Sequence, residues 1–149
     1  IAGTSPTTVE NPAAGLLAPG ANTTTSMLDT DGTANDYLSI VGMLLPTNDG
    51  FVGLNSWEIP STAGTYTFTI NGYDAGTEAN DELTASIPAP IVFGTGTGGT
   101  GVAASDNNTS VHIHRGSIGD DNSTGGISDL DNSVHRWLNP IARITVVVQ

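Results

Sequence analysis

Acidic side chains gather beside turn-forming residues at three places in the sequence, residues 48–49, 74–82 and 120–131. Calcium binds about six to eight oxygen ligands that flexible loops supply, and carboxylates close together repel one another until a cation neutralises them. None of the three segments matches the EF-hand loop, so their spacing leaves two interpretations open. The acids either hold calcium or keep a lysine-free surface solvated.

Two of the three histidines are separated by one residue, His112 and His114. In a strand, residues at this spacing point to the same face, so the two rings are expected to lie side by side. The third, His135, precedes Trp137 closely. Imidazole ligands suit zinc or copper, and copper is bound more tightly in the usual affinity order. The alternative is that all three are hydrogen-bonded structural side chains.

Motifs of known catalytic machinery are missing from the sequence. The chain has no cysteine, no G-x-S-x-G nucleophile elbow and no H-E-x-x-H zinc motif. Its glycine-rich stretch at residues 94–101 contains no lysine and precedes no expected helix, which excludes a phosphate-binding loop. We therefore expect a protein that is not an enzyme.

The charge balance excludes further classes of partner. The chain has 149 residues, with 15 acidic residues against three arginines and no lysine, for a net charge of −12. Such a chain repels nucleic-acid backbones and anionic lipids. The apolar stretch at residues 141–148 is too short to cross a bilayer. We expect neither nucleic-acid binding nor a membrane span.

Hydrophobic patterning predicts an all-β fold. Strands are expected at residues 37–45, 51–54, 65–70, 83–87, 110–114 and 141–148, and one short helix at residues 129–138. The near-continuous apolar run at residues 37–45 predicts burial on both faces. A turn is expected at residues 47–50, and loops at residues 29–36, 73–78, 94–108 and 120–128. The strand spacing favours an antiparallel β-sandwich over residues 37–149, preceded by an extended arm or edge strand at residues 1–36.

Several motifs in order resemble the spondin domain of secreted bacterial proteins. They are MLLPTNDGFVGL at 43–54, YDAGTEANDE at 73–82, HRGSIG at 114–119, DLD at 129–131, HRW at 135–137 and PIARITV at 140–146. The resemblance covers about residues 38–148. It implies an antiparallel sandwich of about eight strands with a bound calcium ion.

Carried over to this chain, the resemblance makes Asp49, Asp74 and Glu78 the calcium ligands, with Asp81 as a further candidate. It also places His114 and His135 within family motifs. From this we expect them to meet in space, which would allow a second metal site of His112, His114 and His135 for copper or zinc.

The resulting expectation is a secreted, non-enzymatic calcium-binding β-sandwich with a structural or adhesive role, whose partner is an extracellular protein or matrix. The sequence begins at Ile1 without a basic and apolar leader, which we interpret as a mature chain after removal of an export signal. We expect it to be secreted, periplasmic or displayed at the cell surface. Two alternatives remain open. One is an exported protein for copper capture, storage or delivery; the other is a filament or surface-layer subunit that self-associates through its N-terminal arm.

Overall fold

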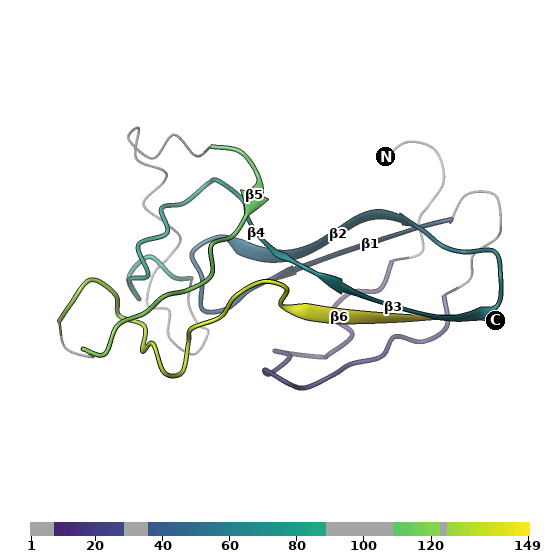
Figure 1. Ribbon diagram of the computed structural model, residues 1–149, viewed down its shortest axis with the longest axis horizontal. Coiled ribbons are helices and arrows are strands. Elements are labelled where there is room, and N and C mark those ends of the chain that lie inside the picture. Colours follow the sequence, from purple (N-terminus) through teal and green to yellow (C-terminus); the bar gives the residue numbers. More distant parts are fainter. Residues whose placement is uncertain (1–7, 29–35, 89–108, 123–124) are drawn as a thin grey trace. The chain divides into compact units, whose positions relative to one another are not determined.

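The computed structural model describes residues 8–28, 36–88, 109–122 and 125–149, and these form an all-β protein (Figure 1). They contain six strands in antiparallel sheets and no helix, so none of them belongs to a membrane-spanning helix. The chain divides into two compact units. One comprises residues 1–38 and 56–59, and the other residues 39–55 and 60–149.

A four-stranded sheet carries the region of interest. In spatial order it contains β1 (Tyr37–Met43), β2 (Gly50–Glu58), β4 (Gly72–Asp74) and β5 (His112–Ile113). The register sets Gly50 opposite Asp74, and Asp74 opposite His112. Residues from three distant parts of the sequence therefore meet at one end of these strands.

A second sheet pairs β3 (Gly64–Ile70) with β6 (Ala142–Val148) along their whole length. Tyr66, Phe68 and Ile70 lie on the more buried face of β3, while the threonines between them are exposed. The strands predicted at residues 65–70 and 141–148 are confirmed. β3 is followed after one residue by β4, so the chain passes directly from one sheet to the other.

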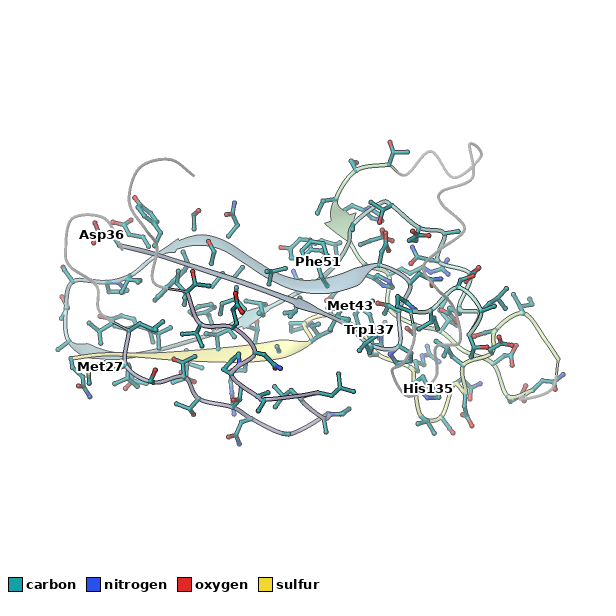
Figure 2. The ribbon with its side chains drawn as sticks, turned by 180° about the vertical axis from the view of Figure 1, so that it is seen from behind. Met27, Asp36, Met43, Phe51, His135 and Trp137 are labelled. Atoms are coloured by element: carbon teal, nitrogen blue, oxygen red, sulfur yellow. The ribbon has the colours of Figure 1, made fainter. Side chains whose placement is uncertain are left out.

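The prediction that the first strand is buried on both faces is wrong. Val41 is 77% exposed and Met43, labelled in Figure 2, is 47% exposed, while the alternate residues Leu38, Ile40 and Gly42 are half-buried. β1 ends the strand order of its sheet, and its side chains alternate between a packed and an open face. A continuous apolar run does not by itself distinguish these two situations.

Residues 83–87 form a turn and not the predicted strand. The amides of Ser86 and Ile87 both donate to the Leu83 carbonyl. Asp81 stabilises this turn, because its carboxylate accepts hydrogen bonds from the Leu83 amide and the Ser86 hydroxyl. A side chain that bonds to nearby backbone in this way competes with strand pairing.

The predicted helix at residues 129–138 is also absent. A single turn forms, in which the amides of Val134 and His135 donate to the Asp131 carbonyl. The Asp131 side chain instead accepts hydrogen bonds from both the amide and the hydroxyl of Ser133. One isolated turn is too short to sustain a helix, because the first hydrogen bond fixes several residues for little gain.

The predicted strand at residues 110–114 shortens to the two residues of β5. Within the described part of the N-terminal arm, residues 8–28 contain turns and no strand. The expected loop at residues 94–108, and all but the last residue of the one at 29–36, lie outside the described residues. The sandwich arrangement and the count of about eight strands remain predictions.

Among the described residues the fully buried apolar side chains are Ile70, Ile87 and Leu130, and buried polar residues outnumber them. The buried polar residues are Thr47, Asn48, Asp74, Glu82, Ser86, His114, Ser117 and Ser128. Most of them belong to the turns and loops that follow the ends of β1, β4 and β5. Hydrogen bonding therefore contributes much of what holds this part of the fold.

Replacement of Gly116 by alanine tests one close backbone approach. Gly116 has a φ of 90°, and an added Cβ would lie 2.2 Å from the Trp137 carbonyl oxygen. We expect Gly116→Ala to lower the free energy of unfolding by about 2 kcal/mol or more, measured by chemical denaturation. The matched control is Gly15→Ala, where an added Cβ meets nothing within 4 Å. Equal stability of the two variants would contradict the close approach.

Candidate functional site

The site begins at the turn between β1 and β2. The Thr47 hydroxyl oxygen accepts a hydrogen bond from the Gly50 amide at 3.0 Å and donates to the Leu44 carbonyl at 2.5 Å. Gly50 has no room for a side chain, since a Cβ would lie 2.7 Å from the Thr47 hydroxyl oxygen. The turn predicted at residues 47–50 is confirmed, and it presents Asp49 immediately before β2.

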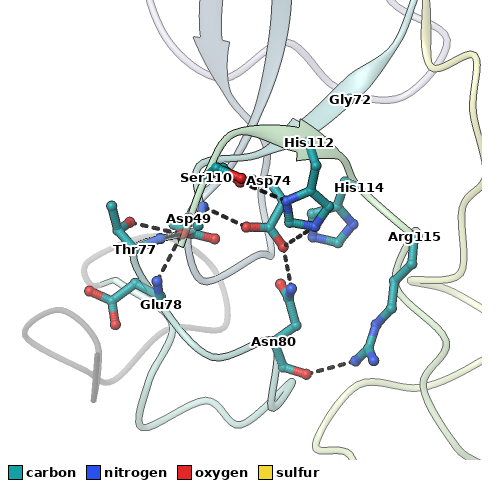
Figure 3. Close-up of polar contacts among 12 residues, drawn as sticks. Asp49, Gly72, Asp74, Thr77, Glu78, Asn80, Ser110, His112, His114 and Arg115 are labelled. Atoms are coloured by element: carbon teal, nitrogen blue, oxygen red, sulfur yellow. Dashed lines mark hydrogen bonds and ion pairs between the residues drawn. The ribbon is translucent and has the colours of Figure 1, made fainter. Parts of the chain in front are cut away.

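The Asp49 carboxylate ties this turn to the loop that follows β4 (Figure 3). Its Oδ2 atom accepts hydrogen bonds from the Thr77 amide at 2.7 Å, the Thr77 hydroxyl at 2.8 Å and the Glu78 amide at 2.9 Å. Its Oδ1 atom is buried and has no hydrogen-bond partner in the part of the chain that the structure describes. Asp49 therefore carries one satisfied oxygen and one open oxygen.

Asp74 is the last residue of β4 and is only 2% exposed. Its Oδ1 atom accepts a hydrogen bond from the Gly76 amide at 2.7 Å, and its Oδ2 atom accepts one from the Asn80 side-chain amide. The His112 Nε2 atom lies 3.6 Å from the same Oδ2. In the β2–β4 pairing, Asp74 lies opposite Gly50, the residue after Asp49. The pairing therefore places the buried Asp74 carboxylate near Asp49.

The other two predicted calcium ligands are placed differently. Glu78 contributes its amide to Asp49, and Figure 3 shows its carboxylate directed away from Asp74. Asp81 accepts hydrogen bonds from the Asn48 side chain, the Leu83 amide and the Ser86 hydroxyl. Of the four predicted ligands, the structure brings Asp49 and Asp74 together.

His112 and His114 differ in their hydrogen bonds. His112 donates its Nδ1 proton to the Ser110 carbonyl at 2.9 Å. Its Nε2 atom, on the other side of the ring, faces Asp74. His114 is 4% exposed, and its Nδ1 atom accepts a hydrogen bond from the Gly116 amide at 2.9 Å. Its Nε2 atom is buried and finds no hydrogen-bond partner among residues 8–28, 36–88, 109–122 and 125–149.

Burial lowers the pKa of His114 below the ordinary value of 6.5. The negative charges of Asp74 and Asp49 act in the opposite direction, while Arg115 and His112 reinforce the lowering. The ring also packs on Trp137, with ring centroids 5.0 Å apart. His114 is therefore a neutral, packed side chain at neutral pH.

His135 belongs to a separate set of contacts. Its Nδ1 atom accepts a hydrogen bond from the Asp131 amide at 3.0 Å. Hydrogen bonds from the Ser133 hydroxyl and amide lower the pKa of the Asp131 carboxylate. In the parts of the chain that the structure describes, no three His, Cys, Asp or Glu side chains are grouped as a metal site. The three histidines are accordingly not gathered into one set.

Glu82 is a site residue that the sequence analysis passed over. It is 9% exposed, and its carboxylate accepts hydrogen bonds from the Ile118 amide at 2.8 Å, the Gly119 amide at 2.9 Å and the Ser128 hydroxyl at 2.8 Å. Burial alone would raise the Glu82 pKa, but these hydrogen bonds and the charge of Arg115 together lower it. Glu82 ends the acidic segment at residues 74–82, but that segment does not reveal its role, because its partners come from remote segments.

Asp120 repeats this arrangement at the protein surface. Its carboxylate accepts hydrogen bonds from the amides of Ser128, Asn122 and Ile127, which lower its pKa. Carboxylates that bind several backbone amides are held in the charged form. The acidic segments of this protein therefore act largely as acceptors that hold loops.

The comparisons with protein-family models, curated proteins and solved structures found no match for this chain.

The Glu82 contacts predict a pH-dependent contribution to stability. A folded-state pKa below the ordinary 4.5 means that stabilisation is complete above pH 4.5 and is lost as the pH falls through the folded-state value. We expect Glu82→Gln to lower the free energy of unfolding by about 2 kcal/mol at pH 7, and the difference from the original chain to shrink in acid.

The matched control is Glu58→Gln, which removes the same charge from an exposed position. It should change the stability by no more than about 0.5 kcal/mol, and urea denaturation at several pH values measures both variants. If the two variants lose stability equally at pH 7, the Glu82 contacts do not contribute as described.

Proposed function

We propose that this protein is a non-enzymatic calcium-binding module with a structural or adhesive role outside the cell. The carrying observation is the Asp49 Oδ1 atom, a buried carboxylate oxygen that has no hydrogen-bond partner among the described residues and lies beside the strand end that holds Asp74. A buried anionic oxygen is costly to leave unpaired, and a hard cation supplies the missing interaction. The resemblance to the spondin domain supports the same pair of ligands.

The donor set suits calcium of modest affinity. Carboxylate oxygens carry about four acceptor positions per group, so Asp74 can add an ion to the hydrogen bonds it already accepts. Two carboxylates leave most of the roughly six to eight calcium ligands to backbone carbonyls and water. Such partly hydrated sites fall in the range of extracellular modules, with a Kd of about 0.1 to 1 mM.

Calcium should act by stabilising the loops. The turn at residues 47–50 and the loop at residues 74–80 are already linked through Asp49, and an ion shared with Asp74 would add a second link. Binding to the folded chain alone stabilises it by mass action. Reversible stabilisation by calcium suits a protein that acts outside the cell, where calcium is plentiful and the folded state has to be maintained.

Calcium titration of a demetallated sample tests the proposal. If the Kd is about 0.1 mM, about 10 mM calcium should raise the free energy of unfolding by about 2.7 kcal/mol relative to sodium chloride of equal ionic strength. Differential scanning calorimetry measures the shift. Asp49→Asn should abolish the calcium-dependent part, because it removes the charge of the open carboxylate.

The matched control is Asp129→Asn. Asp129 also accepts hydrogen bonds from a threonine amide and hydroxyl, at Thr84, but lies on an exposed segment outside the site. Its calcium response should equal that of the original chain. The same response in the original chain and in Asp49→Asn, or no response in either, would refute this site.

One observation favours copper as a second candidate ligand. His112 donates its Nδ1 proton to a backbone carbonyl, which is the usual arrangement of a metal-binding histidine, and its Nε2 atom faces Asp74 Oδ2 at 3.6 Å. This distance is longer than a hydrogen bond and close to the separation of two ligands on one metal ion. We propose His112 and Asp74 as the copper ligands, in a protein for copper capture, storage or delivery.

Copper titration with fluorescence detection tests this second candidate. In a Trp57→Phe background Trp137 is the remaining tryptophan, and it packs on His114 near β5. We expect His112→Ala to weaken copper-dependent quenching by about tenfold or more, as for loss of a metal ligand. His135→Ala should leave quenching unchanged, and quenching that survives replacement of all three histidines would eliminate the candidate.

A further inference from the structure

A small polar cavity lies behind the turn between β1 and β2, separate from the Asp49–Asp74 pair. Its polar lining comes from Thr47, Asn48, Asn80, Glu82, His114 and Ser117, and its volume is about 10 Å³. A space of about this size is the smallest that accommodates one water molecule.

His114 supplies the strongest reason to expect an occupant. Its Nδ1 atom accepts the Gly116 amide proton, so Nδ1 carries no proton and the ring must carry its proton on Nε2. That Nε2–H group is buried and has no hydrogen-bond acceptor within the described residues. An unsatisfied buried donor costs about 1–3 kcal/mol, and native proteins almost always supply a partner.

We propose that this cavity binds a single ordered water molecule, which accepts a hydrogen bond from His114 Nε2–H. Asn48 and Asn80 each donate their side-chain amide to a carboxylate, which leaves their carbonyl oxygens as acceptors on the cavity wall. Ser117 accepts the Trp137 ring proton and can still donate its own. The water thus has the two to four partners that buried waters typically need.

The chemistry of the wall rejects an ion in place of water. A cation would face the Nε2 proton, and a metal bound at Nε2 would force that proton onto Nδ1 and break the Gly116 hydrogen bond. An anion would lie against the Glu82 carboxylate in a space that fits only one water. The occupant is therefore a neutral acceptor of the size of water.

The water links the turn at residues 46–48 to the segments that carry Glu82, His114 and Ser117. It would complete a buried polar network in which the ring of His114 bonds through both nitrogens. His114 is then a structural side chain, and His112 is the histidine left for a metal. This inference does not depend on the proposed calcium site.

Nuclear magnetic resonance of the full chain labelled with ¹⁵N-histidine tests the inference, with His112→Ala and His135→Ala used to assign the rings. We expect His114 to carry its proton on Nε2, and that proton to show a nuclear Overhauser effect to a long-lived water. A proton on Nδ1, or an Nε2 proton with no bound water, would overturn the proposal. Addition of zinc should leave the His114 proton in place, and its transfer to Nδ1 would also overturn it.

A ring substitution provides the second measurement. His114→Phe keeps an aromatic ring against Trp137 but removes the Nε2–H donor, so water relaxation dispersion should detect one fewer long-lived water. Tyr37→Phe is the control, because it removes a hydroxyl donor from a ring that is 61% exposed, and it should leave the number unchanged. An unchanged number in a folded His114→Phe chain would overturn the proposal, and should that variant not fold, the tautomer and water contact in the original chain decide it. A failed calcium response would leave these readouts unaffected, so the two proposals fail separately.

Discussion

Hydrogen bonds from backbone and side-chain donors to carboxylates hold together the turns and loops that follow β1, β4 and β5. The chain contains 15 acidic residues and three arginines, so cations on its own side chains cannot balance its charge. Asp49, Asp74, Glu82 and Asp120 instead each accept two or more hydrogen bonds from loops that are otherwise irregular. A hydrogen bond to a charged group contributes about 1.5–3 kcal/mol where it is buried, and this compensates for the small apolar core of the described residues.

This constraint shapes the candidate site. Because its Oδ2 atom is engaged by Thr77 and Glu78, the Asp49 carboxylate is fixed in orientation before any ligand arrives. Asp74 is fixed in the same way by Gly76 and Asn80. A ligand would therefore meet two preoriented oxygens and would not have to order flexible side chains, which is how a site with few protein ligands still gains useful affinity. The same engagement limits how many oxygens can turn toward an ion.

The histidines divide their roles according to the backbone around them. In the strand β5, the His112 Nδ1 atom lies 2.9 Å from the Ser110 carbonyl oxygen and donates a hydrogen bond to it. After the strand ends, the positive φ of Gly116 turns its amide toward His114, whose Nδ1 becomes an acceptor. His135 likewise accepts from the Asp131 amide. A spacing of two residues thus produces two different tautomers, and these determine which ring can approach a metal.

Local patterning was enough to predict the all-β class, the strands β3 and β6, and the turn at residues 47–50, because each depends on neighbours within a few positions. It wrongly predicted a strand at residues 83–87 and a helix at residues 129–138. In these segments the Asp81 and Asp131 side chains compete with regular backbone hydrogen bonding. The importance of Glu82 and the separation of His135 from the other histidines emerged only from the folded chain. The partners of Glu82 lie 36 to 46 residues away along the chain, and the register of β2, β4 and β5 decides which loops meet.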